Sequence, residues 1–325
     1  MLNSDLSSHP PDEALRQRVA DELIPYPQWS GLREALIANH PHISWYLNTS
    51  NACINAIRCQ WGSPARLLGQ SQPHADCDSF LANIINPLIR TGELTDGSLQ
   101  GTFDDRKVRW SNVPSDNLID ERDALLELKV APSCFQHCKQ DIDRSSDDAL
   151  RMMLLGIQQE ANPYLYFARG IGVCIIPLTQ EGSAFIGKRA NTQEYSNSLS
   201  FVSGWASFCT EVKDINLFRD ASREIQEEIH YPEQIDSSKL QFIGISGHPL
   251  TGEADLVFLF QSDLHDEYFY SRSWPEHSAW LPLRTCKEAT NLLHHGFLSS
   301  EEVSLEVMFS SRTALEHLIS HKVLA

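Results

Sequence analysis

The stretch Arg223-Glu224-Ile225-Gln226-Glu227-Glu228 places one arginine and three carboxylates within six consecutive residues. At about 100° per residue of a helix, Glu224, Glu227 and Glu228 lie at roughly 0°, 300° and 40°, so the three carboxylates share one narrow face. We expect the apolar neighbours to make the other face of this helix: Ala221, Ile225 and Ile229. Like charges this close repel one another unless a cation lies among them. Oxygen ligands in this number, with no histidine or cysteine in the cluster, favour Mg²⁺ or Mn²⁺ over zinc.

An acidic triplet on an exposed helix can also be no more than a solvated face, so the surrounding sequence has to decide. A β-rich segment ending in Phe201-Val202-Ser203-Gly204-Trp205 precedes the triplet, and Lys188-Arg189 ends an earlier strand. This arrangement resembles the Nudix box, whose pattern is glycine, five residues, glutamate, seven residues, and then Arg-Glu-aliphatic-any-Glu-Glu-any-Gly-aliphatic. Gly204 matches the first glycine, and residues 223–228 match every fixed position of the second half.

The chain departs from the Nudix pattern at two places. Gly204 and Arg223 are 19 positions apart (223 − 204) where the family has 14, so five residues are inserted. The middle glutamate of the pattern therefore has no fixed equivalent, and Glu211 is the nearest candidate. His230 stands where the family closes its helix with a glycine at positive φ, so we expect His230 either to adopt the left-handed conformation or to end the helix differently.

The resemblance implies metal-assisted hydrolysis of a diphosphate linkage. It implies that Glu224, Glu227 and Glu228 hold Mg²⁺ or Mn²⁺, and that Arg223 orients Glu224 and the loop carbonyls. Glu211 is the candidate catalytic base that the pattern suggests. Three further carboxylates stay open as alternatives for the base: Glu253, Asp255 and Glu276.

A narrower resemblance lies upstream of the box, in Leu125-Leu126-Glu127-Leu128-Lys129-Val130 and Gly170-Ile171-Gly172-Val173, and downstream in Glu276-His277-Ser278. These segments are similar to the UDP-glucose pyrophosphatase subgroup of the Nudix superfamily, which implies an NDP-sugar such as UDP-glucose as the substrate. The subgroup's Gly-Gly-His-Pro-Glu-Pro stretch is replaced here by residues 203–208. Expected substrate-binding residues are Lys188, Arg189, Gly204, Trp205 and Glu276, and aromatic residues that could stack on a base are Tyr164, Tyr166, Phe167 and Trp205.

Hydrophobic periodicity predicts an α/β fold with a region in front of it. We expect residues 165–325 to form an α/β sandwich whose order of elements resembles the Nudix fold, which implies an α/β/α sandwich with a mixed sheet. Residues 101–164 are expected to supply lead-in strands and a helix that pack on this core, and residues 1–100 to form an additional N-terminal region of unknown role. Expected strands span residues 108–110, 125–130, 170–178, 184–189, 199–202, 239–246, 254–261 and 279–283; expected helices span residues 12–23, 80–90, 147–159 and about 304–321.

Composition excludes several classes of protein. The chain has 325 residues, 42% of them hydrophobic, and a net charge of −17, which argues against a nucleic-acid duplex as partner because phosphate contacts need clustered lysine and arginine. No stretch is long and apolar enough to span a membrane, and no basic region followed by an apolar run opens the sequence. The eight cysteines form no Cys-x-x-Cys pair. We therefore expect a cytoplasmic protein with reduced thiols. The Nudix resemblance implies a small-molecule nucleoside diphosphate derivative as partner.

One alternative belongs to a different functional class. A Nudix-like regulatory module would keep the sheet and the acidic helix but only bind a nucleotide, with residues 1–160 as an effector region. The inserted loop and His230 favour this alternative, whereas the complete residues 223–228 favour a hydrolase, because a binding module has no need to keep mutually repelling metal ligands together.

Overall fold

The computed structural model describes residues 12–38, 47–48, 56–61, 90, 106–112, 119–120, 124–190, 198–208, 215–274, 276–295 and 305–324. The α-helices are α1 (Glu13–Glu22), α2 (Ser30–Ile37), α5 (Phe135–Ile142), α6 (Ser146–Glu160), α7 (Leu217–Ile229), α8 (Asp266–Tyr270), α9 (Cys286–His295) and α10 (Phe309–Ser320). The strands are β1 (Leu47–Asn48), β2 (Ala56–Trp61), β3 (Arg106–Trp110), β4 (Ile119–Asp120), β5 (Leu125–Cys134), β6 (Ile171–Leu178), β7 (Ala184–Arg189), β8 (Leu199–Ser200), β9 (Val202–Trp205), β10 (Leu240–Gly247), β11 (Ala254–Gln261) and β12 (His277–Leu283).

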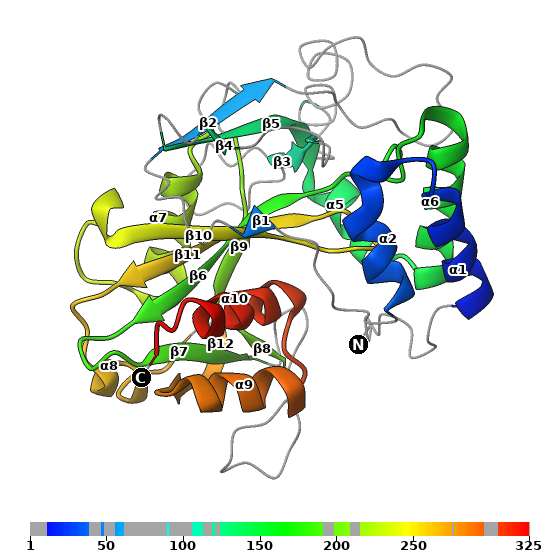
Figure 1. The fold of residues 1–325 in the computed structure, drawn as a ribbon. Helices are drawn as coiled ribbons and strands as arrows, with labels where there is room; N and C mark the ends of the chain where they lie inside the picture. Colours follow the sequence, from blue (N-terminus) through cyan, green and yellow to red (C-terminus); the bar gives the residue numbers. More distant parts are fainter. Residues whose placement is uncertain are drawn as a thin grey trace.

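A mixed sheet forms the centre of the molecule (Figure 1). In the described residues its strands run in the order β1-β10-β11-β6-β7-β12, while β9 pairs with β6 and β8 pairs with β7. The β11–β6 pair is parallel and the other pairs are antiparallel. Strand β9 pairs with residues 172–175 of β6, whereas β7 pairs with β6 only at its last residue, Leu178. The sheet therefore has a gap between β9 and β7.

Helices cover both faces of this sheet, as β6 makes clear. Every residue of β6 is buried, as expected for a strand between two layers. Val173 and Ile175 join the core beneath α7, whereas Cys174 and Ile176 join the core beneath α9 and α10. The predicted mixed α/β fold, with helices on both faces of the sheet, is therefore confirmed.

A second, smaller sheet lies against the first. It has the order β2-β5-β3, with β4 pairing β5, in the described part of the chain. Strand β3 joins it to the main sheet, since the Val108 N–H donates to the Ala206 carbonyl at 3.1 Å and the Trp110 N–H donates to the Arg169 carbonyl at 2.8 Å. Residues 106–110 thus lie alongside the end of β9, next to the acidic helix α7.

A third hydrophobic cluster unites α1, α2 and α6 at the side of the molecule (Figure 1). Tyr164 and Phe167 are fully buried in it. The Tyr164 hydroxyl donates to the Pro249 carbonyl at 2.7 Å, which ties the cluster to the turn after β10. These two aromatic residues, considered above as base-stacking candidates, are core residues in the structure.

Most predicted elements are present with small differences in their ends. The strands predicted at residues 184–189 and 254–261 have the observed bounds, and the helix predicted at 147–159 is α6. The strand predicted at 199–202 is interrupted at Phe201, so it forms β8 and β9. Of the helix predicted at 80–90, residues 80–89 lie outside the described residues.

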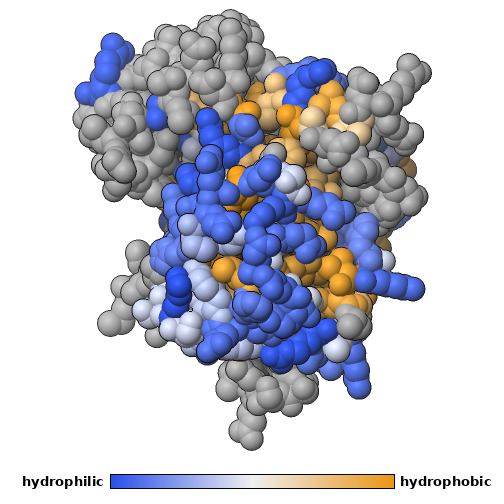
Figure 2. Space-filling model, turned by 90° about the vertical axis from the view of Figure 1, so that its left-hand side faces the viewer, coloured by the Kyte–Doolittle hydropathy of each residue, from blue (hydrophilic) through white to orange (hydrophobic). Residues whose placement is uncertain are grey.

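One face of the molecule is mostly hydrophilic. Figure 2 shows the face at the left of Figure 1, where hydrophilic residues cover most of the middle and hydrophobic residues show between them towards the upper right. Within the described residues, every helix is too short or too polar to cross a membrane.

Candidate active site

Helix α7 is fixed at both ends by local hydrogen bonds. At its start, the Asn216 side chain accepts hydrogen bonds from the N–H groups of Phe218 and Arg219, both at 3.1 Å. At its end, His230 has φ 48° and ψ 44°, so it adopts the left-handed conformation that was one of the two expectations. The Tyr268 hydroxyl lies 3.0 Å from the Ile229 carbonyl oxygen and 2.8 Å from that of His230, so its one proton is shared between two carbonyls of the last turn.

The acidic residues of α7 do not share one exposed face. Asp220, Glu224 and Glu228, spaced four residues apart, are buried with exposed fractions of 3%, 8% and 1%, while the Glu227 side chain is 56% exposed. The expectation that the carboxylates and the apolar residues occupy different faces is therefore wrong. Around the helix axis, with Glu224 at 0°, the arc from roughly 0° to 140° contains the apolar residues Ala221, Ile225 and Ile229 as well as Glu224 and Glu228. All of these residues are buried, so this whole side of the helix faces the sheet.

Strand β9 leaves room for these buried carboxylates. A Cβ atom on Gly204 would lie 2.0 Å from Glu224 Oε1, so any other residue at this position would collide with the carboxylate. One residue earlier, the Ser203 N–H donates to Glu228 Oε1 at 3.0 Å. Gly204, which matches the first glycine of the box, thus permits the Glu224 carboxylate to lie close to the backbone of β9.

Arg223 connects the buried and the exposed carboxylates. Its guanidinium lies 2.7 Å from Glu224 Oε1 and 2.9 Å from Glu227 Oε2, with Asp220 Oδ1 further away at 3.8 Å. Two contacts from one planar guanidinium fix the directions of both glutamates. This geometry suits a residue that orients Glu224.

His277 contacts Glu228 from the other side of the gap in the sheet. The His277 Nε2 atom lies 2.7 Å from Glu228 Oε2, and both side chains are almost completely buried. The sequence left His277 without a role, although it belongs to the Glu276-His277-Ser278 segment. No local pattern reveals this contact, because it joins positions 49 residues apart.

Lys107 brings a positive charge from the second sheet. It is buried on β3, and its Nζ donates to Ser207 Oγ at 3.2 Å. Its charge lowers the pKa of Asp220 and of Glu224, so it lies near both carboxylates. The sequence pattern does not identify Lys107 either, since the pairing of β3 with residues 206–207 cannot be read from spacing.

Burial dominates the electrostatics of α7. Desolvation raises the pKa of Glu224 and of Glu228 to about 8, and the pKa of Asp220 to about 6, with Arg223 opposing the rise at Glu224 and Asp220. Asp220 Oδ2 is buried and has no hydrogen-bond partner within the described residues. These carboxylates are costly to hold ionised without a further cation.

Two more buried carboxylates lie near Gly204. Trp205 Nε1 donates to Glu253, and Asp255 Oδ1 lies 2.2 Å from the point where a Cβ on Gly172 would be. The Gly204 carbonyl oxygen lies 2.9 Å from the same point, so Asp255 is close to the backbone of β9. Burial raises the pKa of Glu253 and of Asp255, and the charge of Asp255 raises the pKa of Glu253 further. Two of the alternative bases therefore lie beside β9.

The other predicted site residues have the following positions. Lys188 and Arg189 end β7, where Arg189 pairs with His277 of β12, and the charge of Arg189 lowers the pKa of Glu228. Glu276 precedes His277 and its charge raises the pKa of Glu228. Glu211 lies outside the described residues.

The donor chemistry of the site fits a hard divalent cation, but only in part. Carboxylate oxygens are the preferred ligands of Mg²⁺, which is commonly held by one or two carboxylates together with waters and substrate phosphates. Among the residues that the structure describes, no group of three His, Cys, Asp or Glu side chains is arranged to hold a metal ion. A cation here would use few protein ligands and would depend on water or substrate oxygens for the others.

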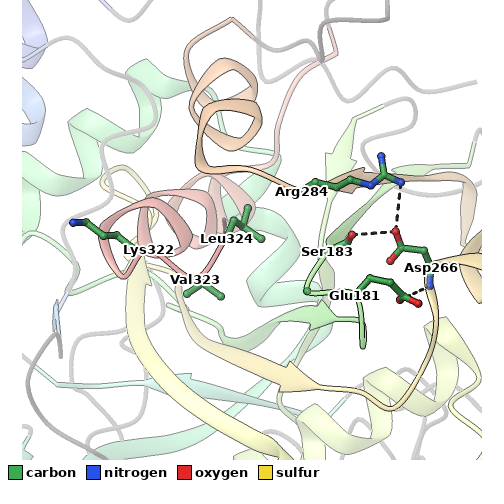
Figure 3. Close-up of a pocket in the computed structure, with 8 residues that line it drawn as sticks. Glu181, Ser183, Asp266, Arg284, Lys322, Val323 and Leu324 are labelled. Carbon is green, nitrogen blue, oxygen red and sulfur yellow. Dashed lines mark hydrogen bonds and ion pairs between the residues drawn. The ribbon is translucent and has the colours of Figure 1, made fainter.

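A hollow at the opposite end of β6 is separate from this site. It has a volume of about 530 Å³ and is lined by Glu181, Gly182, Ser183, Asp266, Arg284, Lys322, Val323 and Leu324 (Figure 3). Its central carboxylate is already engaged, since Asp266 accepts from Ser183 Oγ at 3.0 Å and pairs with Arg284 at 3.4 Å. The hollow adds nothing to the carboxylates of α7.

No protein-family model matches the chain, and no curated protein matches its sequence. Among solved structures, it is similar to a MutT protein from Methanosarcina mazei Go1, with 12% identity and a TM-score of 0.31 over 47% of this chain and 94% of the other. It is also similar to a mutT/nudix family protein from Listeria innocua, with 15% identity and a TM-score of 0.32 over 46% and 92%. A likeness with these TM-scores establishes nothing about activity.

Proposed function

We propose that the protein is a Nudix hydrolase that cleaves the diphosphate linkage of a nucleoside diphosphate-linked compound, preferably an NDP-sugar such as UDP-glucose. The products are a nucleoside monophosphate and a phosphorylated partner. One observation carries the proposal: Glu224 is buried against Gly204 of β9 beside Arg223, and Glu228 is buried between the Ser203 N–H and His277 Nε2. A protein that needed these side chains only for stability would gain more from apolar residues at the same positions.

The proposed cofactor is Mg²⁺ or Mn²⁺, held by Glu224, Glu227 and Glu228. When bound, such an ion neutralises phosphate charge and polarises the phosphoryl group. The buried Glu224 and Glu228 are fixed on the sheet side, and the exposed Glu227 reaches the rim of the site. This division suits an ion that lies between the protein and a phosphate group from solvent.

The remaining residues act on the substrate and on the attacking water. Arg223 orients Glu224 through the 2.7 Å contact between them. Glu211 is the proposed base that removes a proton from the water, and Asp255 is the alternative whose position near Gly204 supports it. Lys188, Arg189, Trp205 and Glu276 are the proposed substrate contacts in addition to Gly204.

The preference for an NDP-sugar rests on the similarity of residues 125–130, 170–173 and 276–278 to the UDP-glucose pyrophosphatase subgroup. The rebuilt loop between Gly204 and Arg223 favours a changed specificity with retained chemistry, because loops set selectivity while helices hold the catalytic ligands. A cytoplasmic location belongs to the same proposal.

The experiment is a substrate panel. The protein is incubated with UDP-, ADP- and GDP-sugars, dinucleotides and nucleoside triphosphates in Mg²⁺ or Mn²⁺, and the products are separated by chromatography. Glu228→Gln is the test variant and Glu22→Gln, an exposed residue of α1, is the matched control. Turnover of an NDP-sugar by wild type and Glu22→Gln, and its loss in Glu228→Gln, is the expected result. Tight binding of an NDP-sugar without any turnover would establish the regulatory module instead.

A further inference from the structure

We propose that His277 is a positioning residue: its Nε2–H holds Glu228 in the one orientation in which Glu228 can bind a divalent cation. This inference rests on the proposed function, because it assigns a role to a residue behind a proposed metal ligand. It adds a histidine from β12 to a site that the acidic helix and β9 otherwise form.

The contact is short and shielded from solvent. The His277 Nε2 and Glu228 Oε2 atoms are 2.7 Å apart, and the exposed fractions of the two residues are each 1%. The second carboxylate oxygen, Oε1, accepts the Ser203 N–H at 3.0 Å. Donors on two different strands therefore hydrogen-bond the two carboxylate oxygens of Glu228. Each oxygen still has a lone pair that can face a cation.

The hydrogen bonds of the ring indicate its tautomer. Nδ1 is buried without a hydrogen-bond partner in the described part of the chain, so a proton on it would be an unsatisfied donor. A proton on Nε2 instead makes the 2.7 Å contact an N–H···O bond to Glu228, which becomes charge-assisted when a bound cation ionises the carboxyl group.

The His277 ring packs against Gly187 and Trp280. A Cβ atom on Gly187 of β7 would lie 2.2 Å from His277 Nδ1, so the ring fits only because this position is glycine. Its other neighbour is Trp280, with ring centroids 4.4 Å apart. The pairing of β12 with β7 shifts register between His277 and Ala279, a bulge that re-aims the side chain before it.

A role in packing alone does not account for this arrangement. A buried histidine that only filled space would be replaced at no cost by an apolar residue, whereas here it contacts a fully buried carboxylate. Hydrogen-bond partners behind metal ligands fix the orientation of the ligand, and their loss weakens metal affinity by about 10- to 100-fold. Strand β12 thus contributes to the proposed metal site without a ligand of its own.

The test measures Mn²⁺ affinity of the full chain by electron paramagnetic resonance of free Mn²⁺, without substrate. We expect His277→Leu to weaken Mn²⁺ binding by about 10- to 100-fold and His277→Gln, whose amide N–H can reach the same oxygen, to recover most of the loss. His317→Leu replaces another buried histidine, on α10, and is expected to leave the affinity unchanged.

A second variant covers the case in which His277→Leu does not fold. Gly187→Ala keeps every donor but displaces the ring, so it should weaken Mn²⁺ binding in the same direction. Wild-type affinity in a folded His277→Leu protein, or in Gly187→Ala, would overturn the role of His277. A wild-type protein that binds no Mn²⁺ at all would instead overturn the proposed function, so the two failures are distinguishable.

Discussion

Gly204→Ala tests the packing of the acidic helix against the sheet. The added Cβ would lie 2.0 Å from Glu224 Oε1, whereas real Cβ contacts are not closer than 3.0 Å, so the carboxylate or β9 has to move by 3.0 − 2.0 = 1.0 Å. A displacement of this size at a reacting centre costs on the order of 10²-fold in rate. We therefore expect kcat/KM for an NDP-sugar to fall about 100-fold, equivalent to about 2.7 kcal/mol of transition-state stabilisation.

The assay is steady-state hydrolysis at saturating Mg²⁺, with thermal unfolding measured in parallel. Gly182→Ala is the matched control, because Gly182 lies in the β6–β7 turn with φ 80° and no atom within 4 Å of an added Cβ. This control strains the backbone by about 1 kcal/mol but should keep full activity. Activity of Gly204→Ala within threefold of wild type would refute the close approach of Glu224 to β9.

Three further predictions follow from the same site. In metal-free protein, the free energy of unfolding should fall as pH rises from about 4.5 to about 8, because burial raises the pKa of Glu228 and the folded state then binds more protons than the unfolded state. Denaturant titrations at several pH values measure this, and the free energy of unfolding of Glu228→Gln should depend less steeply on pH than that of wild type. Lys107→Met should lower kcat/KM on the order of tenfold, since a charge near the carboxylates contributes about 1–2 kcal/mol, while Lys129→Met on the exposed side of β5 should not; equal kinetics would contradict a role for Lys107. A fragment of residues 145–325 should not melt cooperatively in calorimetry, because it lacks β3, whose backbone hydrogen-bonds Ala206 and Arg169; an active fragment would refute this.

The parts of the site that local sequence can encode were predicted. Residues 223–228 form part of one helix because apolar and charged residues alternate with a helical period, and Gly204 precedes it in the strand that faces the helix. The strand 254–261 was predicted with its observed bounds because Leu256 to Phe260 is a continuous apolar run. His230 was identified as a departure, and its left-handed backbone is one of the two outcomes that its position allowed.

The parts that depend on distant pairing were not predicted. The contact of His277 with Glu228 depends on the register of β12 against β7, including a bulge. The approach of Lys107 to Asp220 depends on the pairing of β3 with a segment 100 residues later. The burial of Glu224 was also missed, because a helical projection gives angles but not how much of the arc the sheet covers. Single-sequence patterns carry no information about these long-range contacts.

The most direct test of the proposed chemistry is hydrolysis of an NDP-sugar in ¹⁸O-labelled water with Mn²⁺, followed by mass spectrometry of the products. Attack of water on phosphorus predicts one labelled oxygen in one phosphate product and none on the sugar carbon, with little turnover of nucleoside triphosphates. Label on the sugar carbon, turnover of triphosphates alone, or binding of the NDP-sugar without cleavage would contradict the proposed hydrolase.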